Sequence, residues 1–440
     1  MKIMKFGGTS VGKPERMQQV SELITQGDEP VITVLSALSG TTNALVAIGD
    51  AMATGDRQLA KENIDKLEAH YHEFIKDLLK QEKTYNKAKN IVSEHFEFLN
   101  IILKISFSEA LSKDILAQGE LLSTKIFSVY LEEKGIEHAL LPALEFMSID
   151  ANDEPQISSI KSKLTNLLKQ HGSKKLFITQ GYICRNSRGE VDNLKRGGSD
   201  YSASLIAAAI NASVCEIWTD ISGMHNNDPR VVKKTRPIDQ LSFEEAAELA
   251  YFGAKILHPA SIWPAQFYKV PVKLLNTMEP TATGTLITEE AGSVGVKAVA
   301  AKDGITSINI KSSRMLLAYG FLRKIFEVFE KYKTSIDMIT TSEVAVSVTI
   351  DNINNIKEIK KELEPFGTIS VESDHTIISV VGNEIAQTQD VLKKLFEALA
   401  SVQVRMVSYG GSKHNISLLV PSADKTRTLQ LLNKGLFDLE

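Results

Sequence analysis

Short runs of apolar residues without polar alternation recur through the first two-thirds of the chain. They lie at 3–6, 31–35, 176–179, 215–219 and 272–275. Strands buried on both faces of a parallel sheet have this pattern, because neither face needs polar side chains. Helical patterns lie between the runs, such as the alanine-rich segment 201–210. Strands that alternate with helices predict an open α/β sheet.

Two other sequence patterns occur, one within this alternation of strands and helices and one after it. The segment from about 55 to 135 is rich in Lys and Glu and has apolar residues at helical spacing, which predicts a helical insertion with a solvated charged face. After the linker-like AGSVG at 291–295, the order strand, helix, strand, turn and strand occurs twice. Units of this order are the building blocks of ferredoxin-like βαββαβ domains.

Composition narrows the class of protein. A chain of 440 residues is too long for one hydrophobic core, so several domains are expected. Its net charge of −4 argues against a nucleic-acid or membrane-surface partner, which would need a basic excess. Two cysteines, Cys184 and Cys215, cannot build a disulfide framework or a Cys-rich zinc site. With no apolar signal core and no membrane-length apolar run, we expect a cytoplasmic protein.

Two glycine loops are the candidates for chemistry. KFGGTSVG at 5–12 follows the first strand, and glycines let backbone N–H groups approach a phosphate. Its spacing nearly matches a Walker A loop, but Pro14 stands where Ser or Thr should be, so a simple tight turn is the alternative. RGGSDYS at 196–202 precedes a predicted helix, where Ser199 or Asp200 could be only an N-cap. Together the loops suggest a site that holds a phosphoryl group from several sides.

The order of motifs along the chain resembles the signature set of aspartate kinases. The motifs are KFGGTSV at 5–11, LSALSGTTN at 35–43, GELLST at 119–124, GGSDYSA at 197–203, TDISGM at 219–224, NDPRV at 227–231 and GAKILHP at 253–259. The last third resembles the paired ACT domains of these enzymes, and MLLAYGFL at 315–322 with DMITTSEV at 337–344 is similar to their lysine-sensitive branch.

The resemblance implies an amino-acid-kinase fold, a mostly parallel sheet sandwiched by helices, over residues 1–292. Residues 293–440 would hold two ACT domains, one at about 312–373 and one at about 296–311 plus 374–440. Since the sequence ends at Glu440, no homoserine dehydrogenase domain would follow and the enzyme would be monofunctional.

The implied reaction moves the γ-phosphoryl group of ATP onto the β-carboxylate of L-aspartate, giving 4-phospho-L-aspartate and ADP. A free aspartate side chain has a pKa of about 3.9 and is ionised at neutral pH, so no general base is required. The site must instead supply cations and oriented donors that bring an anion to a polyanion. Magnesium is implied by ATP chemistry, and no all-protein metal cage is expected.

The resemblance assigns roles to individual residues. Lys5 would bind the transferring phosphoryl group, and Asp200 would position Lys5 or magnesium. The other nucleotide contacts would be Gly7, Gly8, Thr9, Ser10, Thr219, Asp220, Arg230 and Lys255. Arg230 could instead be a turn cation after Asp228 and Pro229. His225 stands where the family often has an aromatic residue, so a stacking contact to adenine would be weaker or replaced.

Four residues are predicted to bind the substrate. Arg196 would pair with its α-carboxylate, because arginine suits bidentate carboxylate recognition. Glu120 would hold its ammonium group, although an ordinary helical glutamate is the alternative. Thr42 would donate a hydrogen bond to it unless it is an N-cap, and Ser199 would touch substrate or phosphate.

The ACT region implies an amino-acid effector, L-lysine by the resemblance, and a homodimer formed through these domains that could assemble into a tetramer. The predicted effector residues are Met315, Gly320, Phe321, Leu322, Asp337, Thr341, Ser342 and Glu343. Asp337 could hold an effector ammonium group, whereas Met315, Phe321 and Leu322 could be packing only. Leu317, Ala318 and Tyr319 replace more polar residues of the lysine-sensitive enzymes, so threonine or no effector stays open.

Two other functions remain compatible with the sequence. One is a kinase of glutamate, acetylglutamate or a nucleotide, against which Arg196, Glu120 and the ACT-like units argue. The other is a catalytically silent amino-acid sensor, which would have no need for Lys5, Asp200 and two glycine loops.

Overall fold

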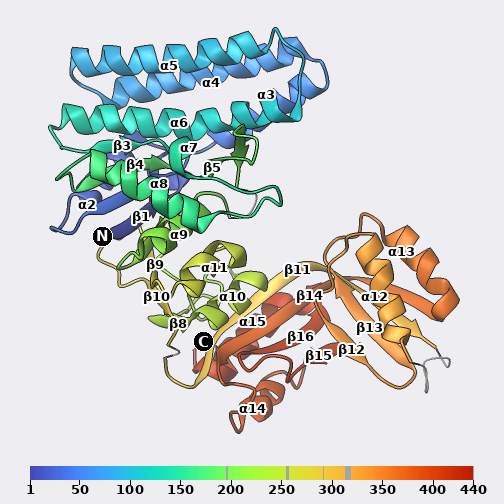
Figure 1. Cartoon of the computed structure of the whole chain (residues 1–440). Helices are drawn as coiled ribbons and strands as arrows, with labels where there is room; N and C mark the ends of the chain where they lie inside the picture. Colours follow the sequence, from blue (N-terminus) through green and yellow to red (C-terminus); the bar gives the residue numbers. More distant parts are fainter. Residues whose placement is uncertain (195–196, 254–256, 291, 313–318, 440) are drawn as a thin grey trace. The chain divides into compact units, whose positions relative to one another are not determined.

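The computed structural model describes residues 1–194, 197–253, 257–290, 292–312 and 319–439. The chain forms two compact units, Met1–Met224 with Leu257–Glu289, and His225–Ile256 with Glu290–Glu440 (Figure 1). Across the described ranges, no helix is both long and apolar enough to cross a membrane.

The first unit is built on a mostly parallel sheet. Its strands are β1 (Lys2–Phe6), β2 (Val31–Leu35), β3 (Ala139–Leu141), β4 (Leu176–Gln180), β7 (Cys215–Thr219), β9 (Val272–Asn276) and β10 (Thr285–Thr288). They lie in the order β3-β4-β2-β1-β7-β9-β10, and only the β9–β10 pair is antiparallel. Each predicted strand is confirmed to within one residue at either end. Every residue of β2 and β4 is buried, which explains their lack of polar alternation.

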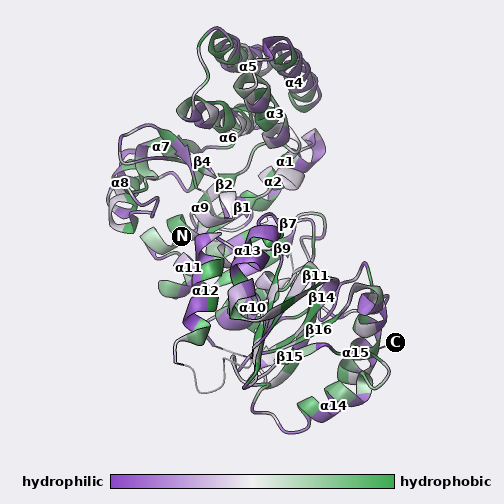
Figure 2. Ribbon diagram, turned by 90° about the vertical axis from the view of Figure 1, so that its right-hand side faces the viewer, coloured by the Kyte–Doolittle hydropathy of each residue, from purple (hydrophilic) through white to green (hydrophobic). Residues whose placement is uncertain are grey.

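Helices cover both faces of this sheet, as Figures 1 and 2 show. On one face α6 (Glu109–Glu133) packs against β2, β3 and β4, and on the other α9 (Gly198–Ile210) packs against β1, β2 and β7. The remaining elements are α1 (Gly8–Val11), α2 (Pro14–Ile24), α3 (Thr41–Ala53), α4 (Arg57–Leu78), α5 (Glu82–Ile102), α7 (Ala143–Phe146), α8 (Ile157–Gln170), α11 (Pro259–Phe267), β5 (Ile183–Arg185) and β6 (Val191–Asn193).

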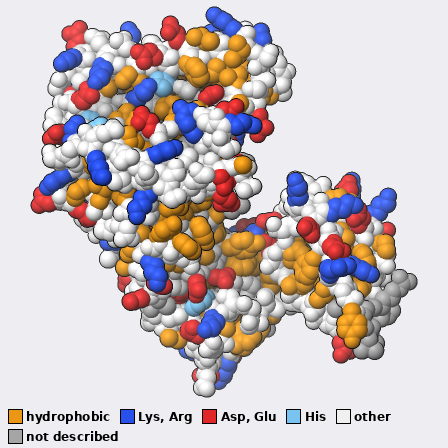
Figure 3. Space-filling view, viewed as in Figure 1, with side chains coloured by type: hydrophobic (Ala, Val, Ile, Leu, Met, Phe, Trp, Pro, Cys, Tyr) orange, Lys and Arg blue, Asp and Glu red, His pale blue; other side chains and the backbone are white. Residues whose placement is uncertain are grey.

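The segment predicted as a helical insertion contains α4, α5 and α6. Their apolar faces share one core with α2, α3 and the sheet, and its fully buried members include Ile64, Tyr71, Phe96 and Phe127. Acidic and basic side chains intermix on the side shown in Figure 3, which is the pattern of solvated helical faces. The insertion is therefore continuous with the core of the first unit.

The second unit contains β8 (Gln240–Ser242), α10 (Phe243–Tyr251) and a sheet in the order β12-β13-β11-β14-β16-β15. Its elements are β11 (Gly295–Lys311), α12 (Phe321–Lys331), β12 (Ile339–Thr341), β13 (Ala345–Ile350), α13 (Ile356–Leu363), β14 (Thr368–Asn383), α14 (Val391–Ala398), β15 (Met406–Ser408), β16 (Asn415–Pro421) and α15 (Lys425–Phe437). The predicted ferredoxin-like pattern of strands and helices is confirmed twice.

Two long antiparallel strands join the ferredoxin-like halves. Residues 306–311 of β11 pair with β13, and 307–311 also pair with 368–372 of β14, whereas 295–302 pair with 377–383 of β14. The register shifts between Lys302 and Ser307, where Gly304 has a φ of +76° that favours glycine. Each half therefore has its own core while sharing β11 and β14.

Candidate active site

Lys5 and Asp200 meet at the carboxyl ends of the central strands. Lys5 lies near the end of β1, and Asp200 lies in the first turn of α9. Lys5 Nζ is 2.7 Å from Asp200 Oδ1, and both side chains are largely buried. The N-cap of α9 is Gly197. The alternative interpretation, in which Ser199 or Asp200 is only the N-cap of this helix, is therefore wrong. The pair places a cation where open α/β sheets bind their ligands.

The glycines after β1 lie in tight packing. A Cβ on Gly7 would lie 3.2 Å from Lys5 Nζ, and a Cβ on Gly8 would lie 3.0 Å from the Ala37 carbonyl oxygen. Thr9 and Ser10 follow in the short helix α1. The backbone of this loop therefore runs directly beside the Lys5 ammonium group, as expected of a phosphate loop.

The loop after β2 is held between α6 and α9. Ser36 Oγ donates to Ser199 Oγ at 2.9 Å, and Ser123 Oγ donates to the Ser36 carbonyl oxygen at 2.8 Å. A Cβ on Gly181 would lie 2.4 Å from the Ser199 side chain, so this glycine lets α9 approach. Ser199 is thus fixed next to Asp200 by contacts from two other elements.

Glu120 is a buried carboxyl group in α6 and is 4% exposed. Its Oε1 accepts a hydrogen bond from the Ala37 N–H at 3.3 Å. Burial raises the pKa of Glu120 to about 7, and hydrogen bonds from the backbone offset this only in part. A carboxyl group in such surroundings gains from an ammonium partner. Thr42 is exposed in the first turn of α3, whose N-cap is Gly40, so it is not the N-cap of that helix.

The predicted nucleotide contacts lie in both units. Thr219 ends β7, and its Oγ1 donates to Oδ1 of the exposed Asp220 at 3.1 Å. Arg230 belongs to the second unit, where Nη2 and Nε bond to Asp228 at 2.7 and 2.9 Å and the side chain is 79% exposed. This pair is what the alternative interpretation of Arg230, a cation within the turn after Asp228 and Pro229, expects. A contact between Arg230 and a phosphate stays a prediction.

Three of the predicted site residues are not among the residues that the structure describes. Arg196, Lys255 and Met315 lie outside the described residues. His225 is in the second unit, where its Nδ1 is 2.8 Å from Thr235 Oγ1 and burial lowers its pKa.

The predicted effector residue Asp337 lies in a charged and aromatic cluster of the second unit. Its Oδ1 accepts a hydrogen bond from the Tyr251 hydroxyl and pairs with Lys302 Nζ, both at 2.7 Å. Lys302 also pairs with Asp351 at 2.9 Å and lies 4.5 Å from the centroid of the Tyr251 ring. The Asp337 side chain is 1% exposed. The carboxylate expected to hold an effector ammonium group is therefore already bound to an ammonium group of the chain itself.

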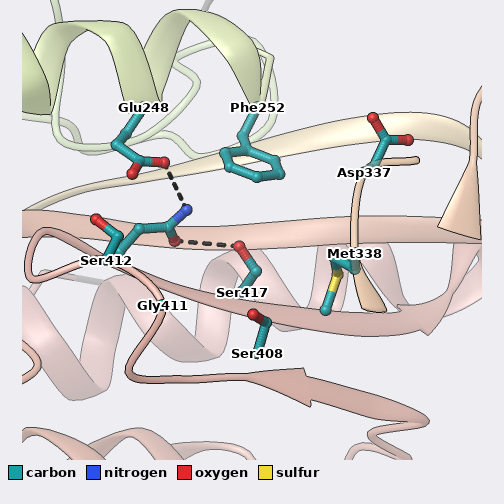
Figure 4. A pocket seen from close by; sticks show the side chains of 9 residues that line it. Glu248, Phe252, Asp337, Met338, Ser408, Gly411, Ser412 and Ser417 are labelled. Carbon is teal, nitrogen blue, oxygen red and sulfur yellow. Dashed lines mark hydrogen bonds between the residues drawn. The ribbon is translucent and has the colours of Figure 1, made fainter. Parts of the chain in front are cut away.

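A small polar cavity of ≈ 180 Å³ borders Asp337 (Figure 4). Across it Asn415 Nδ2 donates to Glu248 Oε2 at 2.8 Å, and Ser417 Oγ donates to Asn415 Oδ1 at 3.1 Å. The other lining residues are Phe252, Met338, Ser408, Gly411 and Ser412.

The remaining effector residues lie around α12 and β12. Gly320 is the N-cap of α12 with a φ of +75°, and the Phe321 ring packs edge-on against Phe366. Phe321 thus contributes to packing, as the alternative interpretation expected, whereas Leu322 is partly exposed. Thr341 ends β12, and Ser342 and Glu343 follow in the exposed turn.

We predict that Lys302→Met destabilises the second unit by about 2 kcal/mol, because it leaves the buried Asp337 carboxylate without its cation. The free energy of unfolding in urea, followed by circular dichroism, measures this loss. Lys413→Met, which removes an exposed pair with Glu384, should change it by less than about 0.5 kcal/mol. Adding Asp337→Asn to Lys302→Met should recover most of the loss, and no recovery would contradict the prediction.

Sequence reasoning did not select Ser36, Ala37 or Ser123 as site residues. Ser36 and Ala37 lie within the LSALSGTTN motif, so the motif could have indicated them. Their part comes from backbone and hydroxyl groups that reach α6 and α9, and only the folded chain brings these elements together.

Comparison with known proteins agrees with this geometry. Residues 1–276 match the amino acid kinase family, and residues 378–436 match an ACT domain. Lysine-sensitive aspartokinase 3 of Escherichia coli (strain K12) is 32% identical over 450 residues, which cover 99% of each chain. Aspartokinase 2, chloroplastic, of Arabidopsis thaliana is 33% identical over 466 residues, which cover 100% of this chain and 84% of that protein.

Solved structures give the same result. The crystal structure of E. coli aspartokinase III in complex with aspartate and ADP (R-state) matches this chain with a TM-score of 0.85 at 32% identity. The match covers 99% of this chain and 100% of the aspartokinase III chain. The complex of the same enzyme with lysine and aspartate (T-state) has a TM-score of 0.82 at 32% identity and covers 99% of each chain.

Proposed function

This chain belongs to the amino acid kinase family, among its aspartokinases, and we propose that it phosphorylates the β-carboxylate of L-aspartate with ATP. The products are 4-phospho-L-aspartate and ADP, and the reaction opens the biosynthesis of lysine, threonine and methionine. The observation that carries this proposal is the buried Lys5–Asp200 pair beside the loop that Glu120 binds.

The chemical step needs little more than charge and orientation. The substrate carboxylate is already ionised, so it attacks the γ-phosphorus without losing a proton, and the bond to the β–γ bridging oxygen breaks. Lys5 would draw charge from the transferring phosphoryl group, and Asp200 would hold Lys5 in place. The backbone and hydroxyls of residues 7–10 would donate to phosphate oxygens, with Thr219, Asp220, Arg230 and Lys255 holding the rest of the nucleotide.

Substrate recognition would use opposite charges at the two ends of aspartate. Glu120 would bind the ammonium group and Arg196 the α-carboxylate, with Thr42 and Ser199 as hydroxyl partners. Glu120 supports this role because its carboxyl group is buried, and the hydrogen bond from the Ala37 amide to Oε1 leaves acceptor capacity for an ammonium group.

Magnesium would arrive with the nucleotide. We propose that the ion is bound mainly through the phosphates, as magnesium in nucleotide sites usually is. Asp200 is the carboxylate that the geometry offers beside Lys5. Bound magnesium would neutralise charge on the β- and γ-phosphates.

We further infer that residues 1–292 act as the catalytic domain and 293–440 as a regulatory pair of ACT domains. L-lysine is the proposed effector, at the residues around Asp337, and a homodimer through the ACT domains is the proposed assembly. The aspartokinase III complex with lysine supports the effector. Since Lys302 already binds Asp337, we expect weak inhibition by lysine compared with a chain that lacks this pair.

The purified chain with MgATP and L-aspartate should form an acyl phosphate that hydroxylamine traps as the hydroxamate. L-glutamate should give none, and L-lysine, but not L-threonine, should lower the rate. Product from glutamate alone would indicate a different amino acid kinase. A folded protein that forms no product from any substrate would contradict the proposal.

A further inference from the structure

Tyr71 connects the helical insertion to the substrate side of the site. It lies in α4, is fully buried, and its hydroxyl is 3.1 Å from Thr41 Oγ1. Thr41 is the first residue of α3, and its own N–H donates to the Leu38 carbonyl oxygen at 3.0 Å. The hydroxyl of Tyr71 therefore bonds to the end of the segment 36–42, which we call the 36–42 loop.

The same loop touches Glu120 from its other side. A Cβ on Gly119 would lie 2.8 Å from Ala37 Cβ and 3.3 Å from Thr41 Cγ2, so α6 and the loop are in tight contact one residue before Glu120. The Ala37 N–H donates to the Glu120 carboxylate. Thr41 thus lies between the Tyr71 hydroxyl and the turn of α6 that presents Glu120.

The aromatic ring of Tyr71 has a separate role in packing. It lies 5.9 Å from the Phe96 ring of α5 and belongs to the core shared by α2 to α6 and the sheet. Ring packing would be served equally by phenylalanine, whereas the hydroxyl bonds, among the described residues, to Thr41 of the 36–42 loop. The two roles can therefore be separated by removing one oxygen atom.

We propose that Tyr71 is a positioning residue for aspartate binding: through Thr41 its hydroxyl fixes the 36–42 loop, and with it the amide that orients Glu120. This assigns a task to the insertion, because α4 exists only within it. The inference rests on the proposed function and concerns the affinity for aspartate, leaving the nucleotide side unchanged.

Electrostatics agree with this placement. The Glu120 charge acts on the hydroxyls of Tyr71 and Tyr182, and burial is the main reason why the pKa of each is raised. The Glu120 charge raises both pKa values further, while the Thr41 hydrogen bond lowers that of Tyr71. The hydrogen bond from the Ala37 N–H lowers the pKa of Glu120, so a 36–42 loop released from the Tyr71 hydroxyl would weaken this bond and let that pKa rise.

The test is Tyr71→Phe in the full chain. We expect the KM for aspartate to rise about five- to tenfold with kcat and the KM for ATP within twofold, the effect of one lost neutral hydrogen bond. The acid limb of kcat/KM for aspartate should move to higher pH. Thr41→Val should reproduce both changes, and the double variant should add nothing further, because both remove the same interaction.

Tyr130→Phe is the matched control, since it removes the hydroxyl of another tyrosine that packs in the same core, ten residues along α6 from Glu120. It should leave the KM for aspartate and the pH limb unchanged. An unchanged pH limb in Tyr71→Phe, or equal effects of both variants, would overturn the proposal. Inactivity of the unmodified chain would instead refute the proposed function, so the two failures are distinguishable.

Discussion

Lys5→Met is expected to lower kcat by about 10³-fold while the KM for aspartate changes little, because an oriented cation acts mainly on charge that develops in the transition state. The variant keeps the length of the side chain and removes its charge. The hydroxamate assay under saturating substrates measures the loss. Activity above a tenth of the unmodified chain would contradict the role of Lys5.

Lys2→Met provides the control on the same strand. Lys2 begins β1 and pairs with Glu216 at 3.4 Å, so it matches Lys5 in residue type and strand and also pairs with a carboxylate. Its loss should leave kcat within twofold, because it lies at the amino end of β1, opposite to the glycine loop.

Asp200→Asn tests whether Asp200 works through Lys5. If it only positions the Lys5 ammonium group, the Lys5→Met and Asp200→Asn double variant should be no slower than Lys5→Met alone. A further loss in the double variant would show that Asp200 has a second task, such as holding magnesium.

The sheet and the two glycine loops were predictable because their signals are local, whereas the pairing of Lys5 with Asp200 was expected only from the family resemblance. Apolar runs mark strands buried on both faces, and the glycine loops lie directly at the end of β1 and the start of α9. The pairing of Asp337 with Lys302 was not predictable, because the two residues are 35 positions apart and come together through pairing of the strands around them. The helical pattern of the insertion likewise gave no sign that Tyr71 reaches the 36–42 loop.

In the second unit, the sequence pattern predicted the elements but not how the two halves are connected. The repeated order of elements predicted two ferredoxin-like domains, and the sheet has this arrangement twice. The repeat did not indicate that β11 and β14 are single long strands serving both halves. Pairing between strands far apart in sequence depends on register, which local pattern does not determine.

Glu120→Gln is expected to raise the KM for aspartate by about 10- to 100-fold, the value of one lost charge-assisted hydrogen bond to the ammonium group. For the unmodified chain, kcat/KM for aspartate should fall about tenfold per pH unit below pH 7, because the free enzyme must hold Glu120 ionised and burial raises its pKa to about 7. Glu132 lies on the same helix and forms an exposed ion pair with Lys87. Glu132→Gln should therefore change neither the KM for aspartate nor the pH dependence of kcat/KM.

The same substitution should stabilise the fold at alkaline pH. The folded pKa of Glu120, about 7, lies above its ordinary value of 4.5, so the unfolded chain gives up this proton first. The cost of ionising Glu120 is therefore absent below pH 4.5, grows up to pH 7, and reaches roughly 3 kcal/mol above it. Because glutamine keeps an oxygen acceptor for the Ala37 N–H and carries no charge, urea unfolding should show Glu120→Gln more stable than the unmodified chain at pH 8 and nearly equal at pH 5. Equal stability at both values would show that Glu120 is ionised without cost, and that its burial is not what prepares the site for an ammonium group.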